Sequence, residues 1–519
     1  MTFRLPDEPW VPPETTAPAC IAWWAAVAPD APALLAVDGR HLTYHALQEA
    51  TEAFGRACAA LGLGRGDRLL LELPEGMTYT RVLLATMRAA TAVPVSAGKP
   101  ATEADAILAK VKPRAVIARR GEPATFRDRA TAAGIPVLEV DADGTLLPDQ
   151  GAVGPPRPTP DAPVPDELAA ILLTSGTTEL PRAVPIRHDA LLAVCGARVV
   201  IREFTRHDRA LLSAPASFVV GIARAVEALI SGGSAIMVDP LEIVASAAAI
   251  RDLQPTWAWM SPALLELVVD AADRDPAIAE WRPRMVRSGG TRIPPSLVAR
   301  AESLWGVPVL NGYGSTESLG FISAEERPDR IPRKPGSAGQ IRPGLEVTIR
   351  ADNGDALPIG ATGEITVRTG RNFTGYLDDP DATAAIFFPG GWYRTGDVGH
   401  LDSDGYLFVT GRLREMINRG GEKVAPHEVD DALREHPAIA DAAAFAVPDP
   451  RLGEEVAAAV VLCDGAAVSP RDLRRWLVHR LAVHKIPRRI VFLDALPRTA
   501  SGKVQRGALT ERYAADQSA

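Results

Sequence analysis

Residues 174–182 of this 519-residue chain place four hydroxyl side chains, one glycine and one cation directly after an apolar segment. The run reads Thr-Ser-Gly-Thr-Thr-Glu-Leu-Pro-Arg. Hydroxyl and backbone N–H donors, together with a guanidinium, suit a polyphosphate. The spacing differs from the common phosphate loop GxxxxGKS or GxxxxGKT, so the run predicts a phosphate site of another kind. The alternative is a threonine-rich surface turn.

Five further polar or glycine-rich motifs follow in order. They are Ser-Gly-Gly at 288–290, Asn-Gly-Tyr-Gly-Ser-Thr-Glu at 311–317, Tyr-Arg-Thr-Gly-Asp at 393–397, Gly-Gly-Glu-Lys-Val at 420–424 and Leu-Pro-Arg-Thr-Ala-Ser-Gly-Lys at 496–503. Each alone is compatible with a simple turn. Together with residues 174–182 they resemble the motifs of the acyl- and aryl-adenylate-forming superfamily, and most closely those of acyl-CoA synthetases. The resemblance extends from Leu42 to Arg506.

The resemblance implies a reaction between a carboxylate and the α-phosphate of ATP. Both groups are anions, so the reaction needs positive charge where negative charge develops. Lys503 would bridge the carboxylate and an α-phosphate oxygen, with Arg182 and Thr316 as further catalytic residues. Glu317 would hold Mg²⁺, because hard oxygen donors suit magnesium bound to phosphates. The implied cofactors are ATP, Mg²⁺ and CoA or phosphopantetheine.

The nucleotide would be held by residues from several motifs. Tyr313 offers a ring for the adenine, Asp397 offers a carboxylate for the ribose hydroxyls, and Arg412 would reach the ribose. The residues expected to contact ATP or AMP are Thr174, Ser175, Gly176, Thr177, Thr178, Gly290, Thr291, Asn311, Gly312, Tyr313, Gly314, Thr316, Asp397, Arg412 and Lys503.

The phosphate motif departs from the superfamily's usual TSGTTGxPKG. Glu179, Arg182 and Ala183 stand where that pattern has Gly, Lys and Gly. Arg182 keeps the positive charge, whereas Glu179 brings a negative charge beside a triphosphate. We expect Glu179 to turn outward or to pair with a nearby arginine, which would slow ATP entry without abolishing it.

The acid is expected to be apolar and to lack an α-amino group. Amino-acid-activating members of the superfamily place an Asp after a Phe; here Val219 follows Phe218, and a buried ammonium without a partner is costly. Arg224 is expected at a helix surface, with pairing to a second carboxylate as the alternative. The expected pocket residues are Phe218, Val219, Gly221, Trp257, Trp259, Met260, Gly289, Gly290 and Gly312, with plain core packing as the alternative for the large side chains.

The acceptor is expected to be a pantetheine thiol. Gly420 and Gly421, followed by Glu422, would let the thiol-bearing arm pass close to the backbone. Arg451 could meet CoA phosphates. CoA is favoured, although a carrier protein's phosphopantetheine shares the same arm.

The implied mechanism has two steps. Acyl-AMP and pyrophosphate form first; a mobile C-terminal domain then turns about residues 412–414, withdraws Lys503 and presents the thiol. Three alternatives remain: a ligase that loads a carrier protein or passes acyl-AMP to a partner, a non-catalytic acyl- or nucleotide-binding protein, and a luciferase-like oxygenase.

The elements that position these motifs alternate in type. Apolar strands are predicted at 68–73, 93–95, 169–174, 210–214, 235–238, 256–260, 284–287 and 307–310, with helices such as 77–90, 262–272 and 295–305 between them. This pattern predicts a mostly parallel α/β sheet. Ligands of open α/β sheets bind beyond the carboxyl ends of the strands, so the motifs that follow these strands indicate one shared cleft.

Two domains are expected. Residues 1–411 would form the adenylation domain, with two Rossmann-like α/β subdomains at about 1–160 and 161–334 and a small antiparallel β unit at 335–411. Residues 412–519 would form a small mobile α+β domain that carries the catalytic lysine.

Composition and charge exclude several classes of protein. The net charge is −8, which argues against a protein that coats nucleic acid. The apolar run 19–28 is about half of a membrane span and follows acidic residues, so neither a membrane segment nor a signal peptide is predicted. Four widely spaced cysteines indicate a reducing, cytoplasmic location. A monomer or a homodimer is expected.

Overall fold

The structure is a computed structural model that describes residues 8–159, 161–174, 181–238, 242–291, 293–326, 331–368, 370, 373–498 and 504–514. The chain divides into two compact units. The first comprises Met1–Arg333 with Thr369–Ala385, and the second comprises Lys334–Arg368 with Ile386–Ala519. The predicted domain boundary at residues 411 and 412 stays a prediction.

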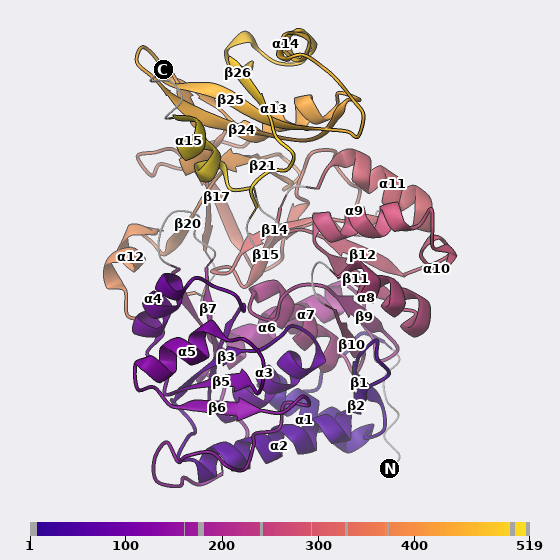
Figure 1. Ribbon diagram of the computed structural model, residues 1–519, viewed down its shortest axis with the longest axis vertical. Helices are drawn as coiled ribbons and strands as arrows, with labels where there is room; N and C mark the ends of the chain where they lie inside the picture. Colours follow the sequence, from indigo (N-terminus) through magenta and orange to yellow (C-terminus); the bar gives the residue numbers. More distant parts are fainter. Residues whose placement is uncertain are drawn as a thin grey trace. The chain divides into compact units, whose positions relative to one another are not determined.

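The first unit contains a six-stranded sheet in the order β6-β5-β3-β4-β7-β8 (Figure 1). All neighbours pair in parallel except β8, which is antiparallel to β7. The strands are β3 (Arg68–Glu72), β4 (Thr91–Val95), β5 (Ala115–Arg119), β6 (Val137–Val140), β7 (Leu168–Leu173) and β8 (Ala183–Arg187), and the associated helices are α2 (Tyr44–Ala60), α3 (Met77–Ala89), α4 (Ala101–Val111) and α5 (Thr125–Ala132). Apolar residues of α4 and α5 pack on one face of this sheet.

A seven-stranded sheet in the order β13-β12-β11-β9-β10-β1-β2 lies in the same unit. Only the β1–β2 pair is antiparallel. The strands are β1 (Pro32–Leu35), β2 (His41–Thr43), β9 (Arg209–Leu212), β10 (Ser234–Met237), β11 (Trp257–Met260), β12 (Met285–Ser288) and β13 (Val309–Leu310). The helices around it are α1 (Ala17–Val27), α6 (His188–Ile201), α7 (Val219–Ile230), α8 (Ile243–Ala248), α9 (Pro262–Ala271), α10 (Pro276–Ala279) and α11 (Pro295–Trp305), with a π-helical turn at Ala249–Leu253.

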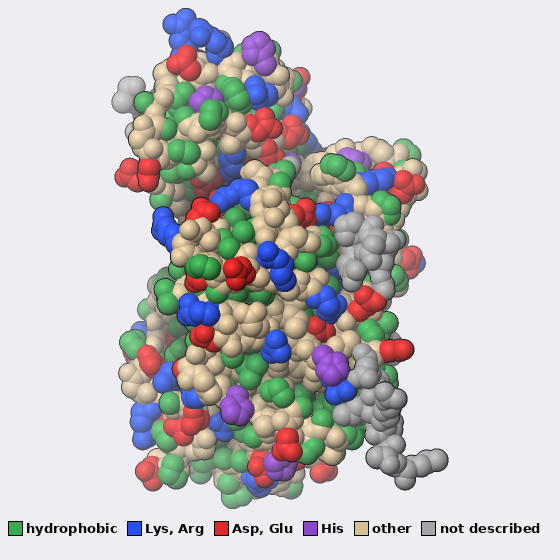
Figure 2. Space-filling model, turned by 90° about the vertical axis from the view of Figure 1, so that its right-hand side faces the viewer, with side chains coloured by type: hydrophobic (Ala, Val, Ile, Leu, Met, Phe, Trp, Pro, Cys, Tyr) green, Lys and Arg blue, Asp and Glu red, His purple; other side chains and the backbone are tan. Residues whose placement is uncertain are grey.

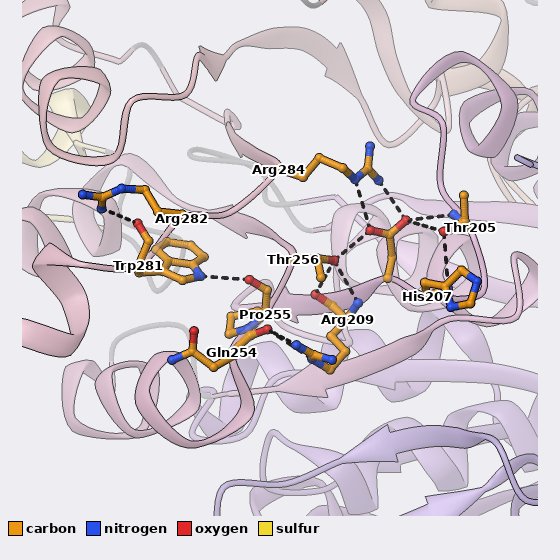
Figure 3. Close-up of a pocket in the computed structure, with 10 residues that line it drawn as sticks. Thr205, His207, Arg209, Gln254, Pro255, Thr256, Trp281, Arg282 and Arg284 are labelled. Carbon is orange, nitrogen blue, oxygen red and sulfur yellow. Dashed lines mark hydrogen bonds and ion pairs between the residues drawn. The ribbon is translucent and has the colours of Figure 1, made fainter. Parts of the chain in front are cut away.

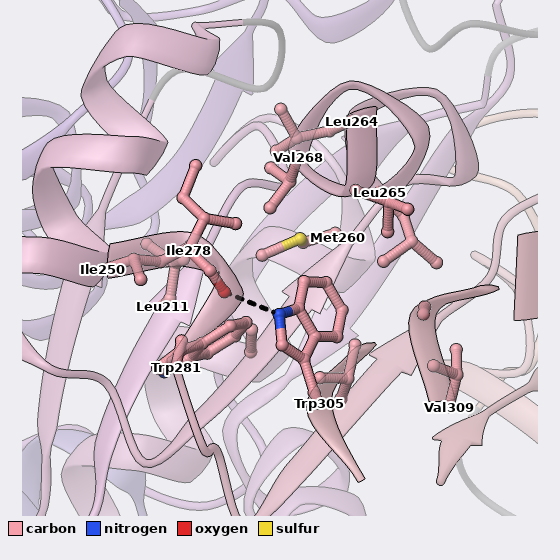
Figure 4. Packing of buried hydrophobic residues seen from close by; sticks show 14 of the residues in the cluster. Leu211, Ile250, Met260, Leu264, Leu265, Val268, Ile278, Trp281, Trp305 and Val309 are labelled. Carbon is pink, nitrogen blue, oxygen red and sulfur yellow. Dashed lines mark hydrogen bonds between the residues drawn. The ribbon is translucent and has the colours of Figure 1, made fainter. Parts of the chain in front are cut away.

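The core of this sheet lies on one face, under α9 and α11 (Figure 4). Alternate residues of the parallel strands project into it, because successive side chains of a strand point to opposite faces. Met260 and Val286 are both fully buried there, and the Trp305 indole Nε1 donates to the Ile278 carbonyl at 2.9 Å. The other face carries Trp257, Trp259 and their neighbours, with α7 packed against β9 and β10.

The first helix is tied to the end of α7. Trp24 Nε1 donates to the Ile230 carbonyl at 2.9 Å, and the Tyr44 hydroxyl lies 2.7 Å from both the Leu229 and Gly233 carbonyl oxygens. Both side chains are buried. Between them, Gly232 adopts φ +83° so closely against Trp24 that a Cβ there would lie 2.6 Å from the indole ring. The apolar run 19–28 is therefore a packed helix.

A hairpin and a short helix complete the first unit. β14 (Gly312–Ser315) and β15 (Gly320–Ala324) pair antiparallel, and α12 spans Pro380–Ala385.

The second unit contains two small sheets. One has the order β17-β18-β20-β19 with β21 added on β20, and the other has the order β23-β22-β25-β24 with β26 added on β25. The strands are β16 (Gln340–Ile341), β17 (Glu346–Arg350), β18 (Gly363–Arg368), β19 (Phe387–Phe388), β20 (Trp392–Leu401), β21 (Leu407–Arg412), β22 (Ile417–Arg419), β23 (Glu422–Val424), β24 (Ile439–Asp449), β25 (Gly453–Leu462) and β26 (Arg489–Phe492). The helices are α13 (Pro426–Arg434), α14 (Pro470–Val478) and α15 (Arg506–Ala514), with 3₁₀ turns at Leu413–Glu415 and Val483–Lys485.

The expected fold class is confirmed: both large sheets are predominantly parallel, and a small antiparallel β unit and an α+β segment follow them. Several predicted elements fall within one or two residues of the observed bounds, among them 68–73, 256–260 and 295–305.

The surface drawn in Figure 2 mixes basic and acidic side chains, and no broad patch of one sign covers the described residues on that face. This mixture fits the modest net charge. Within the described ranges, no helix has both the length and the apolar character that a bilayer crossing requires.

Gly232→Ala should destabilise the first unit more than Gly39→Ala does. Both glycines have φ near +85°, but a Cβ at Gly39 would meet nothing within 4 Å. We expect a loss of ~1 kcal/mol in the free energy of unfolding for Gly39→Ala and ~3 kcal/mol for Gly232→Ala, because only the second adds a clash with Trp24. Urea unfolding measures both; equal losses would show that backbone strain alone decides the effect.

Candidate active site

The predicted phosphate motif covers the segment between the antiparallel strands β7 and β8. Thr174 follows β7 and Arg182 precedes β8, and the backbone N–H of Thr174 donates to the Arg182 carbonyl at 2.9 Å. The Arg182 N–H in turn lies 3.2 Å from the Thr174 hydroxyl oxygen that accepts it. These two bonds close the hairpin on either side of the motif. Ser175, Gly176, Thr177, Thr178 and Glu179 lie outside the described residues, so their predicted roles stay predictions.

Tyr376 links two of the predicted motifs. Its hydroxyl donates to Glu317 Oε1 at 2.9 Å, and the Arg182 guanidinium carbon lies 5.2 Å from its ring centroid. Burial and the nearby Glu317 carboxylate raise the pKa of Tyr376, while Arg182 opposes the shift. The phenol therefore stays protonated and donates to Glu317. The structure thus brings Arg182 and Glu317, 135 positions apart in the sequence, to one residue.

Thr316 and Glu317 occupy the turn between β14 and β15. Ser315 and Ser318 brace this turn, because the Ser315 N–H donates to Ser318 Oγ at 2.9 Å and the Ser318 N–H donates to Ser315 Oγ at 3.3 Å. Leu319 has φ +54°, a conformation that costs a branched side chain free energy. Thr316 is partly exposed, whereas the Glu317 side chain is mostly buried.

The glycine-rich motif after β12 leaves room beside its backbone. Gly290 is exposed with φ +84°, and a Cβ there would meet no atom within 4 Å. Buried Gly289 precedes it and partly exposed Thr291 follows. A ligand can therefore approach the backbone at Gly290, as the sequence predicts for adenine or the acyl group.

The Asn311 side chain hydrogen-bonds within its own loop. Its side-chain oxygen accepts the Gly312 N–H at 2.7 Å, and its backbone exchanges bonds with Glu325, whose Oε2 accepts the Asn311 N–H at 2.9 Å. Tyr313 is half-buried and Gly314 is exposed on β14. These bonds fix the start of the hairpin that carries Thr316 and Glu317.

In the second unit, Asp397 and Arg412 are cross-strand partners on β20 and β21. Arg412 Nε lies 3.0 Å from Asp397 Oδ1; the carboxylate is 9% exposed and the guanidinium side chain 40% exposed. The two predicted ribose ligands therefore lie together. A ribose that binds Asp397 would share this carboxylate with Arg412.

Glu364 supports the same strand and was not identified from the sequence. Its Oε2 accepts from Arg394 Nε at 2.9 Å and Nη2 at 2.8 Å, while its Oε1 accepts the Gly396 N–H at 3.2 Å. Glu364 is almost fully buried. The carboxylate thereby holds the residues just before Asp397. Its sequence signal is a carboxylate next to the alternating apolar residues Ile365 and Val367 of the strand.

Three predicted pocket residues serve packing instead. Met260 was predicted to line the pocket with Trp259, but it lies in the core on the opposite face of β11, because neighbouring strand residues point in opposite directions. At Gly221 a Cβ would lie 2.0 Å from the Pro215 carbonyl oxygen, so this glycine permits close contact between α7 and the preceding loop. Trp257 stacks on Phe204 with ring centroids 4.4 Å apart and is also core.

The other predicted pocket residues lie at the edge of the seven-stranded sheet where a ligand is expected. Phe218 is half-buried, Val219 is 8% exposed and Trp259 is 5% exposed, and these residues lie just beyond or at the carboxyl ends of β9 and β11. Gly312 is buried at the start of β14.

The prediction that Arg224 lies on a helix surface is wrong. Arg224 is 1% exposed on α7, and its Nη1 lies 2.7 Å from Glu227 Oε2. Burial lowers the pKa of Arg224 to about 9, although the Glu227 carboxylate acts in the opposite direction and raises this pKa. The surroundings of the predicted pocket are therefore less apolar than the sequence suggested.

The predicted pantetheine loop is a tight turn between β22 and β23. Gly420 has φ +59° and its N–H donates to the Leu452 carbonyl at 2.8 Å, while Gly421 has φ +93° and open space beside its Cα. Glu422 Oε2 lies 3.5 Å from His484 Nδ1. Open space at Gly421 is compatible with a passing thiol arm. Lys503 lies outside the described residues, so its predicted role stays a prediction.

A hollow of about 470 Å³ lies at the opposite edge of the seven-stranded sheet from the predicted motifs (Figure 3). Its lining comes from the amino ends of β9, β11 and β12. Asp208 accepts from the Thr205 N–H at 2.8 Å, the Thr256 hydroxyl at 2.7 Å and Arg284 Nη2 at 2.8 Å. These polar groups satisfy one another, so the hollow contributes nothing to the predicted chemistry.

Glu317 fits the role of a magnesium ligand on a nucleotide. The carboxylate is a hard oxygen donor, and Mg²⁺ at phosphates needs only one or two protein carboxylates. Among the described residues, no group of three or more His, Cys, Asp or Glu side chains gathers as a metal site. Glu317 would hold the ion, which would supply charge neutralisation at the phosphates.

Comparison with known proteins agrees with this arrangement. The family model for the AMP-binding enzyme matches residues 21–377, and that for the AMP-binding enzyme C-terminal domain matches residues 428–503. A sulfoacetate–CoA ligase of Cupriavidus necator is 35% identical over 95% of this chain and 96% of its own length. A probable CoA ligase of Humulus lupulus is 32% identical over 94% of each chain.

Solved structures of adenylate-forming enzymes share this fold. The crystal structure of ATP-bound MatB from Rhodopseudomonas palustris superimposes with a TM-score of 0.85 at 25% identity, covering 96% of this chain and 99% of that one. The motif order, the parallel sheets and the full-length similarity agree. This chain belongs to the AMP-binding enzyme family of adenylate-forming enzymes, among its acid–CoA ligases.

Proposed function

We propose that this chain converts a non-amino carboxylic acid into its acyl-CoA thioester in two steps, through an acyl-AMP intermediate. The observation that carries the proposal is similarity to CoA ligases along nearly the whole chain, with every motif present in order. The bond between the acid oxygen and the α-phosphorus forms as pyrophosphate leaves. The thiol sulfur then attacks the acyl carbon, and AMP leaves.

Residues of both units have roles in this proposal. Glu317 would hold Mg²⁺ with its carboxylate fixed by Tyr376, and Thr316 would donate to the α-phosphate from the same turn. Asp397 would receive the ribose hydroxyls. Lys503 would serve adenylation, whereas the loop at Gly420 and Gly421 would serve thioester formation.

CoA is the proposed acceptor, and a carrier protein is the alternative. The test is thioester formation by the purified full-length chain with a panel of acids, with either CoA or a phosphopantetheinylated carrier protein. The proposal expects acid-dependent pyrophosphate release and acyl-CoA. Absence of acid-dependent pyrophosphate release across aliphatic, aryl, polycyclic and doubly acidic substrates would overturn it.

The proposed location is the cytoplasm, as a monomer or homodimer. The four cysteines are all free thiols, and three of them are buried, which suits a reducing compartment.

Lys503→Ala should lower the adenylation rate by about 10²-fold or more, because a preorganised charge at the reacting anions is lost. Thioester formation from supplied acyl-AMP should change less than about threefold, a small barrier change. The two half-reactions are measured separately, by ATP–pyrophosphate exchange and by CoA-dependent release of AMP. An equal loss in both would contradict separate roles for Lys503 and the Gly421 loop.

Asp397→Asn should lower kcat/KM for ATP on the order of 10- to 100-fold, because two charge-assisted hydrogen bonds to the ribose weaken. Asp464→Asn, an exposed carboxylate in the same unit, is the matched control. The comparison of ATP with 2′,3′-dideoxy-ATP completes the test. A wild-type preference for ATP that persists in Asp397→Asn would remove Asp397 from ribose recognition.

Glu317→Gln should raise the Mg²⁺ concentration for half-maximal adenylation by about tenfold or more, because a hard anionic ligand is lost. Tyr376→Phe keeps the carboxylate and removes one hydrogen bond, so the Mg²⁺ requirement should stay near wild type while the rate falls about three- to tenfold. Magnesium titrations of the three proteins distinguish ligand from support. An unchanged requirement in Glu317→Gln would contradict the assignment.

A further inference from the structure

Two buried hydrogen-bond donors beside the predicted acyl pocket have no partner among the described residues. They are Trp259 Nε1 and Arg287 Nη1, on side chains that are 5% and 0% exposed. A buried donor without an acceptor costs roughly 1–3 kcal/mol, more for a charged group. Most buried polar groups in natural structures have a partner, so an unpartnered donor beside a pocket is a candidate to bind an acceptor from a ligand.

The two donors lie side by side. Trp259 and Arg287 are partners in the parallel pairing of β11 with β12, so both side chains project from the same face, away from the core around Met260. Arg287 Nη2 is already paired with Glu326 Oε2 at 2.9 Å, and its Nε lies 3.2 Å from Met285 Sδ. The remaining nitrogen, Nη1, is available for an acceptor.

The surroundings favour an anion as that acceptor. Helix α7 packs on the same face, and three buried guanidiniums lie within ion-pair distance of the Glu227 carboxylate. Their distances to it are 3.2 Å from Arg198, 3.0 Å from Arg202 and 2.7 Å from Arg224. Arg287 is close enough to Arg224 that its charge helps lower the pKa of Arg224. Several buried guanidiniums thus lie where the sequence predicted an apolar pocket.

Arg287 is placed to bind the end of a short acid that lies opposite its reacting carboxylate. Arg287 lies on β12 and Gly290 lies two residues beyond the end of that strand, so at most roughly 10 Å of backbone separates them. An arginine side chain covers about half of that distance. A substrate whose reacting carboxylate lies near Gly290 would therefore bring its other end to Arg287 with only a few carbon atoms between.

We propose that the acid substrate carries a second anionic group, a carboxylate or a sulfonate, which Arg287 Nη1 and Trp259 Nε1 bind. This inference rests on the proposed ligase function and names its substrate class. A planar guanidinium suits both oxyanions, and an anionic end group would give the Arg287 Nη1 donor a charged acceptor.

The test compares matched acids in ATP–pyrophosphate exchange with the full-length chain. Dicarboxylic acids of two to six carbons and ω-sulfo acids are each paired with a neutral analogue, the monoamide or the methyl sulfone. The expected result is a kcat/KM at least 10-fold higher for the acidic member of a pair, because an ionised acceptor binds a guanidinium more strongly than a neutral one. The two acidic series distinguish a carboxylate from a sulfonate.

Arg287→Met should reduce this preference by about 10-fold or more, to near parity between the two members of a pair, as loss of a buried charge partner does. Trp259→Phe removes the indole N–H together with the pyrrole ring but keeps an aromatic side chain, and should reduce the preference about threefold. Arg300→Met, an exposed arginine paired with Asp270, is the control that should leave the preference unchanged.

The outcomes separate this inference from the ligase proposal. Efficient activation of neutral acids with no gain from a second anion would overturn the inference and leave the ligase function standing. A preference for doubly acidic substrates that survives both Arg287→Met and Trp259→Phe would also overturn it, since other residues would then bind the group. Failure of every acid to release pyrophosphate would overturn both.

Discussion

The parallel register of β9, β11, β12 and β13 is the constraint on which the rest of the first unit depends. Parallel pairing makes every strand end at the same edge, so the turns that follow the strands gather there. It also sorts alternate residues between two faces. One face becomes a dry core under α9 and α11; the other keeps two donors and several guanidiniums. A shift of one residue would exchange these two sets.

Hydrogen bonds between distant segments hold the reacting groups. Tyr376 lies almost 200 residues after Arg182 in the sequence, yet the Arg182 guanidinium packs over its ring. The Tyr376 hydroxyl also donates to the Glu317 carboxylate. Glu364 has the same role for the strand that carries Asp397. Both supporting groups are buried, so the orientation of the carboxylates they serve is fixed before any nucleotide binds.

The order of the strands and helices could be predicted well from the sequence. Which face of a strand each side chain occupies could not. Strands such as β11 and β12 are short apolar runs that end at glycine or serine, and their motifs identify the family, so both the fold class and the site edge could be predicted. A continuous apolar run has no period that tells which side chain faces the core, and Met260 was therefore assigned to the wrong face. Arg224 looked like a surface residue because an ion pair with Glu227 on the same helix is compatible with a surface position, and the neighbours Arg198 and Arg202 come close only once the chain folds.

The edge of the seven-stranded sheet has a consequence for biosynthesis. β1 pairs with β10, whose residues are about 200 positions later in the chain, and Trp24 and Tyr44 bond to carbonyls at the end of α7. At ribosomal speeds of roughly 5–20 residues per second, the amino-terminal 45 residues wait on the order of 10–40 s for their partners to emerge. During that interval the tryptophans of α1 are without their native cover, so this segment exposes apolar surface until α7 has been synthesised.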